Sequence, residues 1–159
     1  MFETILQIVS AKARQLSPVV EETSTPKAIR IHEADLLPVC LELYQNQQTF
    51  FDQLSCVTGI DNGPATGTME VVYNLYSIPF NLHLMLKVTL PRDSAEIDSL
   101  SSIWRTANWQ EREIFDMFGI RFRNHSDLRR ILMPADWEGY PLRKDYRQQD
   151  YYKNIKVDY

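Results

Sequence analysis

The chain has few of the residues that bind metals or form disulfides. Its 159 residues include two cysteines, Cys40 and Cys56, which form no CxxC pair and have apolar neighbours. We therefore expect two buried free thiols. The three histidines, His32, His83 and His125, lie more than 40 residues apart. The sequence predicts no metal site and no iron–sulfur cluster held by this chain alone.

Glycine is also scarce, and no apolar run is long. The five glycines form neither GxGxxG nor GxxxxGK[ST], which excludes these two kinds of phosphate-binding loop. The GxSxG motif of serine hydrolases is absent too. No stretch approaches the roughly 20 apolar residues of a membrane span, and the start FETILQIVSAKARQL lacks the pattern of a signal peptide. We expect a soluble, unexported chain without a flavin.

The length fits one domain with one hydrophobic core, but the charge is uneven along the chain. Residues 1–120 carry 8 Lys and Arg against 15 Asp and Glu, whereas residues 121–159 carry 9 against 6. A basic end can bind nucleic acid, anionic lipid or an acidic protein surface. The interleaved carboxylates argue against the first two, because a phosphate-binding surface usually keeps its positive potential undiluted.

Apolar periodicity predicts alternating helices and strands in the first 90 residues. Helical spacing predicts a first helix over residues 2–16, ended by Pro18, and a second helix that Asp35 caps. Strands are predicted in KAIRIH, MEVVYNLYS and FNLHLMLKVTL, with the polar DNGPATGT as a turn or loop. The last strand alternates most clearly, and its apolar positions are Leu82, Leu84, Leu86, Val88 and Leu90.

Two capping-box patterns predict two further helices. DSAE at 93–96 and NWQE at 108–111 each place a capping side chain three residues before a Glu. The first helix would bury Ile97, Leu100, Ile103 and Trp104. The second would run from Trp109 to Phe118, bury Trp109, Phe115 and Phe118, and end at Gly119.

The 37 residues after IRF at 120–122 show little periodicity. A segment of this kind is usually functional, disordered or laid across another surface, and its Trp, Tyr, Leu and Met content argues against disorder. We call residues 123–159 the C-terminal segment and expect it to extend from a core formed by residues 1–122.

Three groups of residues are candidates for chemistry. Glu113 and Asp116 share one helix face and could divide acid and base roles in a hydrolase, although a solvated or salt-bridged helix face is the simpler interpretation. His125 could transfer protons, but next to Asn and Asp it more often bonds a loop. Trp137, Tyr140 and Tyr146 could stack a sugar or base, but are more typical of an interface or of the chain's own fold.

The segment EREIFDMFGIRF, followed by NHSDLRRILMPADWEGYPLRKDY, resembles the signature of the 30-kilodalton subunit of respiratory NADH:quinone oxidoreductase, complex I. The resemblance implies a structural subunit of the peripheral arm without catalytic, cofactor-binding or metal-binding residues. FMN, iron–sulfur clusters and quinone would belong to other subunits, and the chief partner would be the 49-kilodalton quinone-site subunit. In a bacterium it would be a peripheral protein on the cytoplasmic face of the plasma membrane.

The resemblance also implies which residues form the signature and the expected interface. They are Glu111, Arg112, Glu113, Asp116, Gly119, His125, Asp127, Arg129, Arg130, Trp137, Gly139, Tyr140, Pro141, Arg143, Lys144, Asp145 and Tyr146. The chain departs from the family at Asn124 and Ser126, where Gly and Pro are common, and at Arg147, where Pro is common.

Two interpretations of the C-terminal segment stay open. Trp137, Tyr140 and Arg143 could anchor it on a partner. Alternatively, Arg129, Arg130 or Arg143 could pair with Glu111, Glu113 or Asp116 and fix the segment to its own helix.

The sequence thus predicts an α/β (α+β) fold of two layers, in which helices cover a mixed or antiparallel sheet and an irregular C-terminal segment follows. The function expected is that of a complex I subunit. The alternatives are the equivalent subunit of a membrane-bound hydrogenase or ferredoxin-dependent complex, a stand-alone hydrolase, and a nucleic-acid-binding module.

Overall fold

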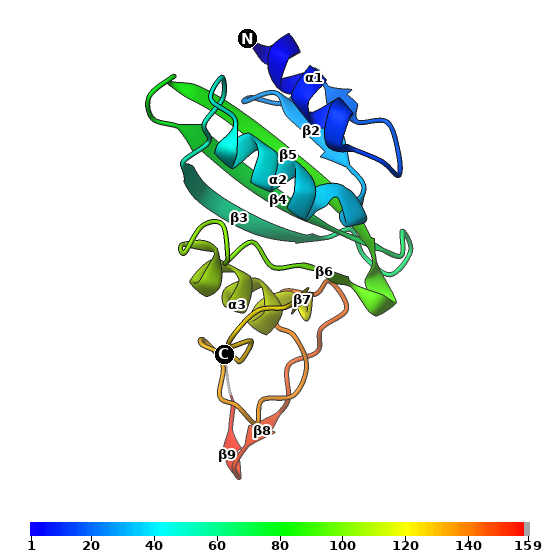
Figure 1. Ribbon diagram of the computed structural model, residues 1–159. Helices are drawn as coiled ribbons and strands as arrows, with labels where there is room; N and C mark the ends of the chain where they lie inside the picture. Colours follow the sequence, from blue (N-terminus) through cyan, green and yellow to red (C-terminus); the bar gives the residue numbers. More distant parts are fainter. Residues whose placement is uncertain (158–159) are drawn as a thin grey trace.

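A five-stranded mixed sheet forms the centre of the fold (Figure 1). The structure is a computed structural model that describes residues 1–157. The strand order is β1-β2-β5-β4-β3, and within this sheet only β2 and β5 pair in parallel. The predicted two-layer fold with a mixed sheet is therefore confirmed. The five strands are β1 (Val19–Glu21), β2 (Ala28–Ile31), β3 (Gln53–Asp61), β4 (Thr68–Ser77) and β5 (Leu82–Pro91).

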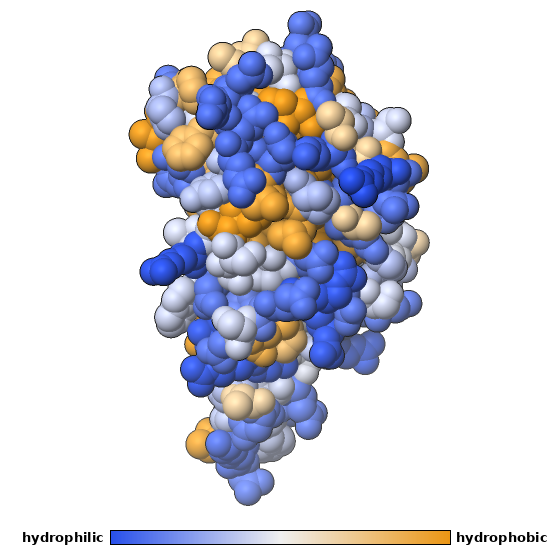
Figure 2. Space-filling model, in the orientation of Figure 1, coloured by the Kyte–Doolittle hydropathy of each residue, from blue (hydrophilic) through white to orange (hydrophobic). Residues whose placement is uncertain are grey.

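Two helices cover one face of this sheet, α1 (Phe2–Lys12) and α2 (Leu36–Gln45), the latter preceded by the short η1 (Glu33–Asp35). Val39 and Leu43 of α2 are fully buried, as are Tyr73 of β4 and Leu86 of β5, which are paired in register. The even positions of β5 alternate as predicted, and all but half-buried Leu82 are buried. On this face, apolar surface gathers between α2 and α3 (Figure 2).

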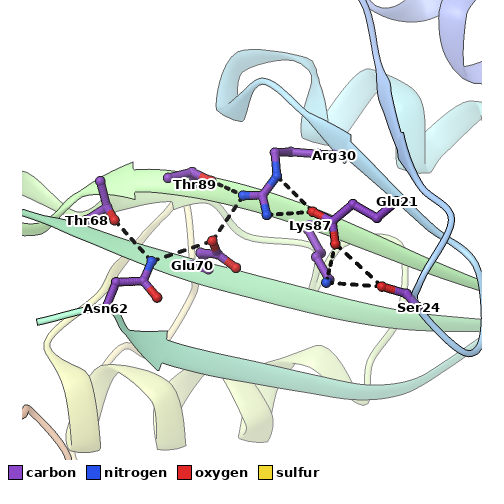
Figure 3. Close-up of polar contacts among 8 residues, drawn as sticks. All are labelled: Glu21, Ser24, Arg30, Asn62, Thr68, Glu70, Lys87 and Thr89. Carbon is purple, nitrogen blue, oxygen red and sulfur yellow. Dashed lines mark hydrogen bonds and ion pairs between the residues drawn. The ribbon is translucent and has the colours of Figure 1, made fainter. Parts of the chain in front are cut away.

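The opposite face of the sheet carries a polar network that ties its strands together (Figure 3). Arg30 on β2 donates to Glu21 on β1 at 2.6 Å and to Glu70 on β4 at 3.1 Å, and it also contacts Thr89 on β5. Lys87 on β5 donates to Glu21 at 2.5 Å. The hydrogen bond from Lys87 and that from Arg30 lower the pKa of Glu21. Such cross-strand pairs favour one register on a face that no helix of residues 1–157 covers.

The prediction that a helix starts at DSAE is wrong. After the short η2 (Arg92–Ser94), the chain forms β6 (Glu96–Asp98), which pairs in parallel with β7 (Arg121–Arg123). Ile97, Leu100 and Trp104 are buried as expected, but from a strand and the turns that follow it. Parallel pairing with a segment 25 residues later decides the outcome, and no local pattern reveals it.

The helix predicted from Trp109 to Phe118 is confirmed as α3 (Ala107–Phe118). Gly119 ends it in the left-handed conformation, with φ +77°. The capping box is wrong, because Thr106 is the N-cap residue and Glu111 bonds outside the helix.

Three other details differ from expectation. The first helix ends at Lys12, which leaves Leu16 exposed. Asp35 makes no side-chain cap on α2, because its carboxylate accepts the N–H groups of Arg14 and Gln15 after α1. Both cysteines are free, but only Cys40 is buried.

The C-terminal segment is mostly irregular, as predicted, and extends away from the sheet (Figure 1). It begins with Arg123, the last residue of β7, and its other strands are the two-residue β8 (Tyr151–Tyr152) and β9 (Ile155–Lys156), which form a small hairpin. The last two residues of the predicted segment, Asp158 and Tyr159, lie outside the described residues.

Within residues 1–157, two fully buried hydroxyls have no hydrogen bond, those of Tyr73 and Ser77, and the Tyr73 hydroxyl lies among the side chains of the hydrophobic core. A buried unsatisfied polar group destabilises a fold, so Tyr73→Phe is expected to raise the free energy of unfolding by about 1 kcal/mol. Urea unfolding measures the change. The control is Tyr76→Phe, whose hydroxyl bonds Asn81 near the surface and should change stability little. A loss of stability in Tyr73→Phe would mean that the hydroxyl has a partner in solution.

Candidate functional site

The signature residues gather around α3, which lies along the outer edge of β3. Gly59 on β3 makes this approach possible, because a Cβ atom there would lie 2.8 Å from the Phe118 ring. The Gln110 side chain accepts the Val57 N–H, a backbone donor on the edge of the sheet. Helix α3 therefore covers part of a strand edge that would otherwise be open.

Asp116 is the polar centre of the site. Its carboxylate is fully buried and accepts the backbone N–H groups of Ile131, Leu132 and Met133 at 2.7–3.0 Å. Arg130 completes the group with an ion pair of 2.7 Å. Four donors from one tetrapeptide thus converge on one side chain of α3.

These donors control the ionisation of Asp116. Burial alone would raise the pKa of this carboxyl, but the Met133 N–H, Arg130 and the two other N–H groups together outweigh burial and lower it. The carboxylate therefore stays charged, and the chain after Arg130 is fixed to the helix.

A second cluster fixes the segment to the sheet. Arg92, buried after β5, donates to Asp61 at the end of β3 at 2.8 and 3.0 Å. The same guanidinium contacts Asp145, and Asp61 also accepts the Lys144 N–H at 2.8 Å. The hydrogen bonds from Arg92, the largest favourable contribution, lower the pKa of Asp61.

Between the two clusters, Tyr140 packs on the end of α3. Its ring occupies the space over Gly119, where a Cβ atom would lie 2.5 Å from the ring. Arg130 and Arg143 lie over the ring, 5.2 and 4.8 Å from its centroid. Arg143 also donates to the Phe118 carbonyl at 2.6 Å, so it satisfies the end of the helix rather than a carboxylate.

On the other side of α3, the side chains of Glu111 and His125 approach to 3.9 Å, and neither side chain is exposed although the His125 backbone is. Glu111 accepts the Ser99 hydroxyl at 2.6 Å and the Leu100 N–H at 2.7 Å. The His125 Nδ1 accepts the Asp127 N–H, and its Nε2 lies 3.0 Å from the Asn108 carbonyl. These bonds fit a neutral imidazole, and the prediction that His125 bonds a loop is confirmed. Burial raises the pKa of Glu111 to about 7, against the opposing effect of its two donors.

The structure separates the two candidate catalytic carboxylates. Asp116 is buried and paired, whereas Glu113 is exposed. Trp109, which was predicted to be buried, is 64% exposed, and the Arg112 guanidinium covers its ring. Helical spacing therefore placed Trp109 on the wrong face of the helix. The buried face of α3 includes Ala107 and Ile114 instead.

The remaining signature residues hold the segment's own shape. The Trp137 indole donates to the Tyr146 hydroxyl at 3.0 Å, and Arg130 donates to the Gly139 carbonyl at 2.8 Å. Arg129 pairs with Asp127 at the surface, and half-buried Pro141 lies between Tyr140 and Leu142. Of the two interpretations left open, the internal one holds for Arg130, while no pairing of Arg129 or Arg143 with an α3 carboxylate is found within residues 1–157.

Sequence reasoning missed Asp61, Arg92, Gln110 and Ser99. Each bonds a residue at least 12 positions away, so local sequence carries no signal for it. Within residues 1–157 no three His, Cys, Asp or Glu side chains are placed to hold a metal ion. Among the same residues, no helix has the length and apolar character needed to cross a bilayer.

Hydrogen bonds and ion pairs hold the C-terminal segment in place, but its residues are not buried. From Arg123 to Val157, every residue is exposed or only half-buried. Figure 2 shows apolar spots within the polar surface at this end of the molecule. The most exposed large apolar side chains of the segment are Leu132 (60%), Leu142 (55%), Tyr151 (60%) and Ile155 (70%).

Residues 29–152 match the family model described as the 30 Kd subunit of respiratory-chain NADH dehydrogenase. The chain belongs to this family. An NADH-quinone oxidoreductase subunit from Chlorobium phaeobacteroides is 38% identical over 96% of this chain and 92% of its own length. Its counterpart from Chloroherpeton thalassium is 46% identical over 72% of the chain, which spans only 48% of that relative.

Two solved structures share the fold. A trypsin-resistant fragment of Nqo5 superposes with a TM-score of 0.65 at 24% identity, covering 80% of this chain and 98% of the fragment. A chain of the membrane-bound sulfane sulfur reductase, an archaeal respiratory membrane complex, superposes with a TM-score of 0.74 at 22% identity. It covers 98% of this chain and 99% of its own length, so the likeness includes the C-terminal segment.

The first prediction from the site concerns Asp116. Asp116→Asn should lower the free energy of unfolding by about 3 kcal/mol, because it leaves Arg130 without its anion and replaces an acceptor oxygen by a donor. Amide hydrogen exchange at Ile131, Leu132 and Met133 should speed up with it. Glu113→Gln, the matched change on the exposed face, should alter neither measurement. Unchanged exchange at the three amides in Asp116→Asn would show that the segment is held by other contacts.

The second prediction concerns pH. An acid whose pKa is raised on folding destabilises the folded state once it ionises, so the penalty from Glu111 grows as pH rises from about 4.5 through 7. The stability of Glu111→Gln relative to the wild type should increase by about 2–3 kcal/mol between pH 5 and pH 8, as measured by urea unfolding. Asp116→Asn should show the opposite trend, with its full deficit at pH 8. A stability difference for Glu111→Gln that does not vary between pH 5 and 8 would refute the raised pKa.

Proposed function

We propose that this chain is a structural subunit of the peripheral arm of an NADH:quinone oxidoreductase and binds no cofactor itself. FMN, the iron–sulfur clusters and quinone would be held by other subunits, and the arm would face the cytoplasm of a bacterial host. Membership of the 30-kilodalton family supports this assignment. The same fold in the archaeal respiratory complex supports a related assembly as the second candidate.

The single observation that carries the proposal is the state of the C-terminal segment. Polar bonds fix its path at Asp116 and Arg92, yet Leu132, Leu142, Tyr151 and Ile155 stay exposed to solvent. A segment held in one shape with exposed Leu, Ile and Tyr side chains has the character of an interface rather than of a core. We infer that it is covered by a neighbouring subunit, chiefly the 49-kilodalton quinone-site subunit.

We expect the segment's exposed apolar residues to control capture by the complex. Leu132→Ser combined with Ile155→Ser should reduce co-purification of the other subunits from detergent-solubilised membranes at least fivefold, because two anchors of the interface are lost. The chain's own thermal unfolding should not change, because both side chains are exposed.

The matched control is Leu16→Ser combined with Ile78→Ser, since both residues are equally exposed but lie outside the segment. It should leave co-purification intact. The purified chain alone should show no visible absorption band. Equal loss of partners in both double variants, or none in either, would contradict the proposed interface.

A further inference from the structure

Glu111 is a buried carboxyl group without a basic partner. Its side chain has no exposed surface, and it accepts two hydrogen bonds, from the Ser99 hydroxyl and the Leu100 N–H. No Lys or Arg of residues 1–157 forms an ion pair with it, whereas Asp116 on the same helix is held by Arg130 and three N–H groups. A buried carboxyl group that lacks a cation favours its protonated form.

The hydroxyl group of Ser99 connects Glu111 to the surface. Its oxygen lies 2.6 Å from Oε2 of Glu111 and 2.7 Å from the Ser101 hydroxyl oxygen. A hydroxyl can donate or accept, so Ser101 can donate to Ser99 and Ser99 to the ionised Glu111. When Glu111 is protonated, both bonds reverse, and no heavy atom has to move. Ser99 is buried and Ser101 is half-buried, so the three oxygens form a hydrogen-bonded row from the core toward solvent.

The imidazole of His125 is the nearest other group that could take the proton, with its Nε2 3.9 Å from the Glu111 carboxyl. Its Nδ1 accepts the Asp127 N–H, and its Nε2 faces the Asn108 carbonyl, to which it donates. A second proton on this ring would have to sit on Nδ1 and would break the bond to Asp127. Glu111, in contrast, can gain a proton with its hydrogen bonds kept.

Other titratable or charged side chains lie on the elements around Glu111 and Tyr73. They are Tyr73 on β4, Cys40 on α2, Asp98 on β6, Arg112 on α3 and Arg123 on β7. Burial raises the pKa of Tyr73 and of Cys40, which keeps both groups neutral. Arg123 donates to Asp98 at 2.9 Å, and Arg112 donates to the Arg129 carbonyl. None of these five side chains supplies a counter-charge to Glu111.

We propose that Glu111 is a buried proton-binding site, and that its proton exchanges with solvent through the hydroxyl groups of Ser99 and Ser101. Burial raises the pKa of this carboxyl from 4.5 to about 7, which agrees with the geometry. Between these two values the folded chain holds a proton here that the unfolded chain releases. Proton uptake is thereby linked to the packing of α3 against the turn after β6. The site lies within one chain and is independent of the proposed function.

Carbon-13 NMR of the full chain, labelled at the glutamate Cδ atoms, tests the assignment of the proton. The Glu111 signal is identified by its absence from Glu111→Gln. We expect this signal to titrate with a midpoint near 7, while nitrogen-15 shifts show that His125 keeps its single proton on Nε2. The control is Glu42, whose pKa is lowered by its bonds to Asn46 and Lys12, so its signal should stay constant between pH 6 and 8.

A pair of variants tests the route of the proton. Ser101→Ala removes the outer hydroxyl and should slow proton exchange at Glu111 by about tenfold or more, as measured by relaxation dispersion of its Cδ signal at the midpoint pH. Ser101→Thr is the matched control, because it keeps a hydroxyl and should keep the rate. The midpoint itself should change little in both variants, since Ser101 bonds Ser99 and not Glu111.

Each part of the inference has its own contrary result. A Glu111 signal that stays constant between pH 6 and 8, or a His125 ring that gains a second proton in its place, would overturn the proton site. Equal exchange rates in Ser101→Ala and Ser101→Thr would overturn the route through the two serines. The proposed function is tested separately, by whether other subunits co-purify.

Discussion

The fold around α3 depends on the buried carboxylate of Asp116. A charged group without partners in this position would be strongly unfavourable, so its four donors from Arg130 to Met133 determine where the chain must run after β7. Because the tetrapeptide is fixed there, Tyr140 can lie on Gly119 and Arg143 can bond the last turn of the helix. One side chain thereby gives an irregular segment a single path.

The second constraint is the close packing of α3 on β3. A side chain at Gly59 would displace Phe118, and the whole helix would move away from the strand edge. The C-terminal segment depends on the distance between α3 and β3, because it is bonded to both elements. Arg130 is bonded to α3, and Lys144 is bonded to Asp61 at the end of β3. Sheet, helix and segment therefore form one connected unit, and Leu128 of the segment packs against the common hydrophobic core.

The parts of this structure that could be predicted from sequence are those governed by local periodicity. Alternation in β5 and the glycine after α3 follow from rules that act within a few residues. The sequence predictions failed where contacts with residues distant in the sequence determine the local structure. Ile97 shows helical spacing with Leu100 and Trp104, but its backbone pairs with β7. Glu111 fits a capping box, but its carboxylate instead accepts the N–H of Leu100, which lies outside the helix.

The contacts at the site were even harder to predict from the sequence than the secondary structure. The family resemblance identified Asp116, Arg130 and Tyr140, but it could not indicate that one carboxylate binds three consecutive N–H groups, nor that Arg92 links Asp61 to Asp145. Backbone donors have no signature in sequence, because every residue except proline carries one. Contacts of this type become visible only when the chain is folded.

The polar tethering also explains how a half-buried segment can serve recognition. A disordered tail loses conformational freedom when it binds, and this loss reduces its affinity. Here the bonds to Asp116 and Arg92 restrict residues 130–145 before any partner arrives, so part of the ordering is already complete. The exposed Leu132 and Leu142 can then contribute most of their burial free energy to association. Beyond Asp145, the hairpin of β8 and β9 contacts the rest of the segment through Tyr152, which bonds Asp136 and packs against Trp137, and through Lys153, which pairs with Asp136. The preformed part of the interface therefore lies next to α3, and the outer hairpin is the part that a partner must still position.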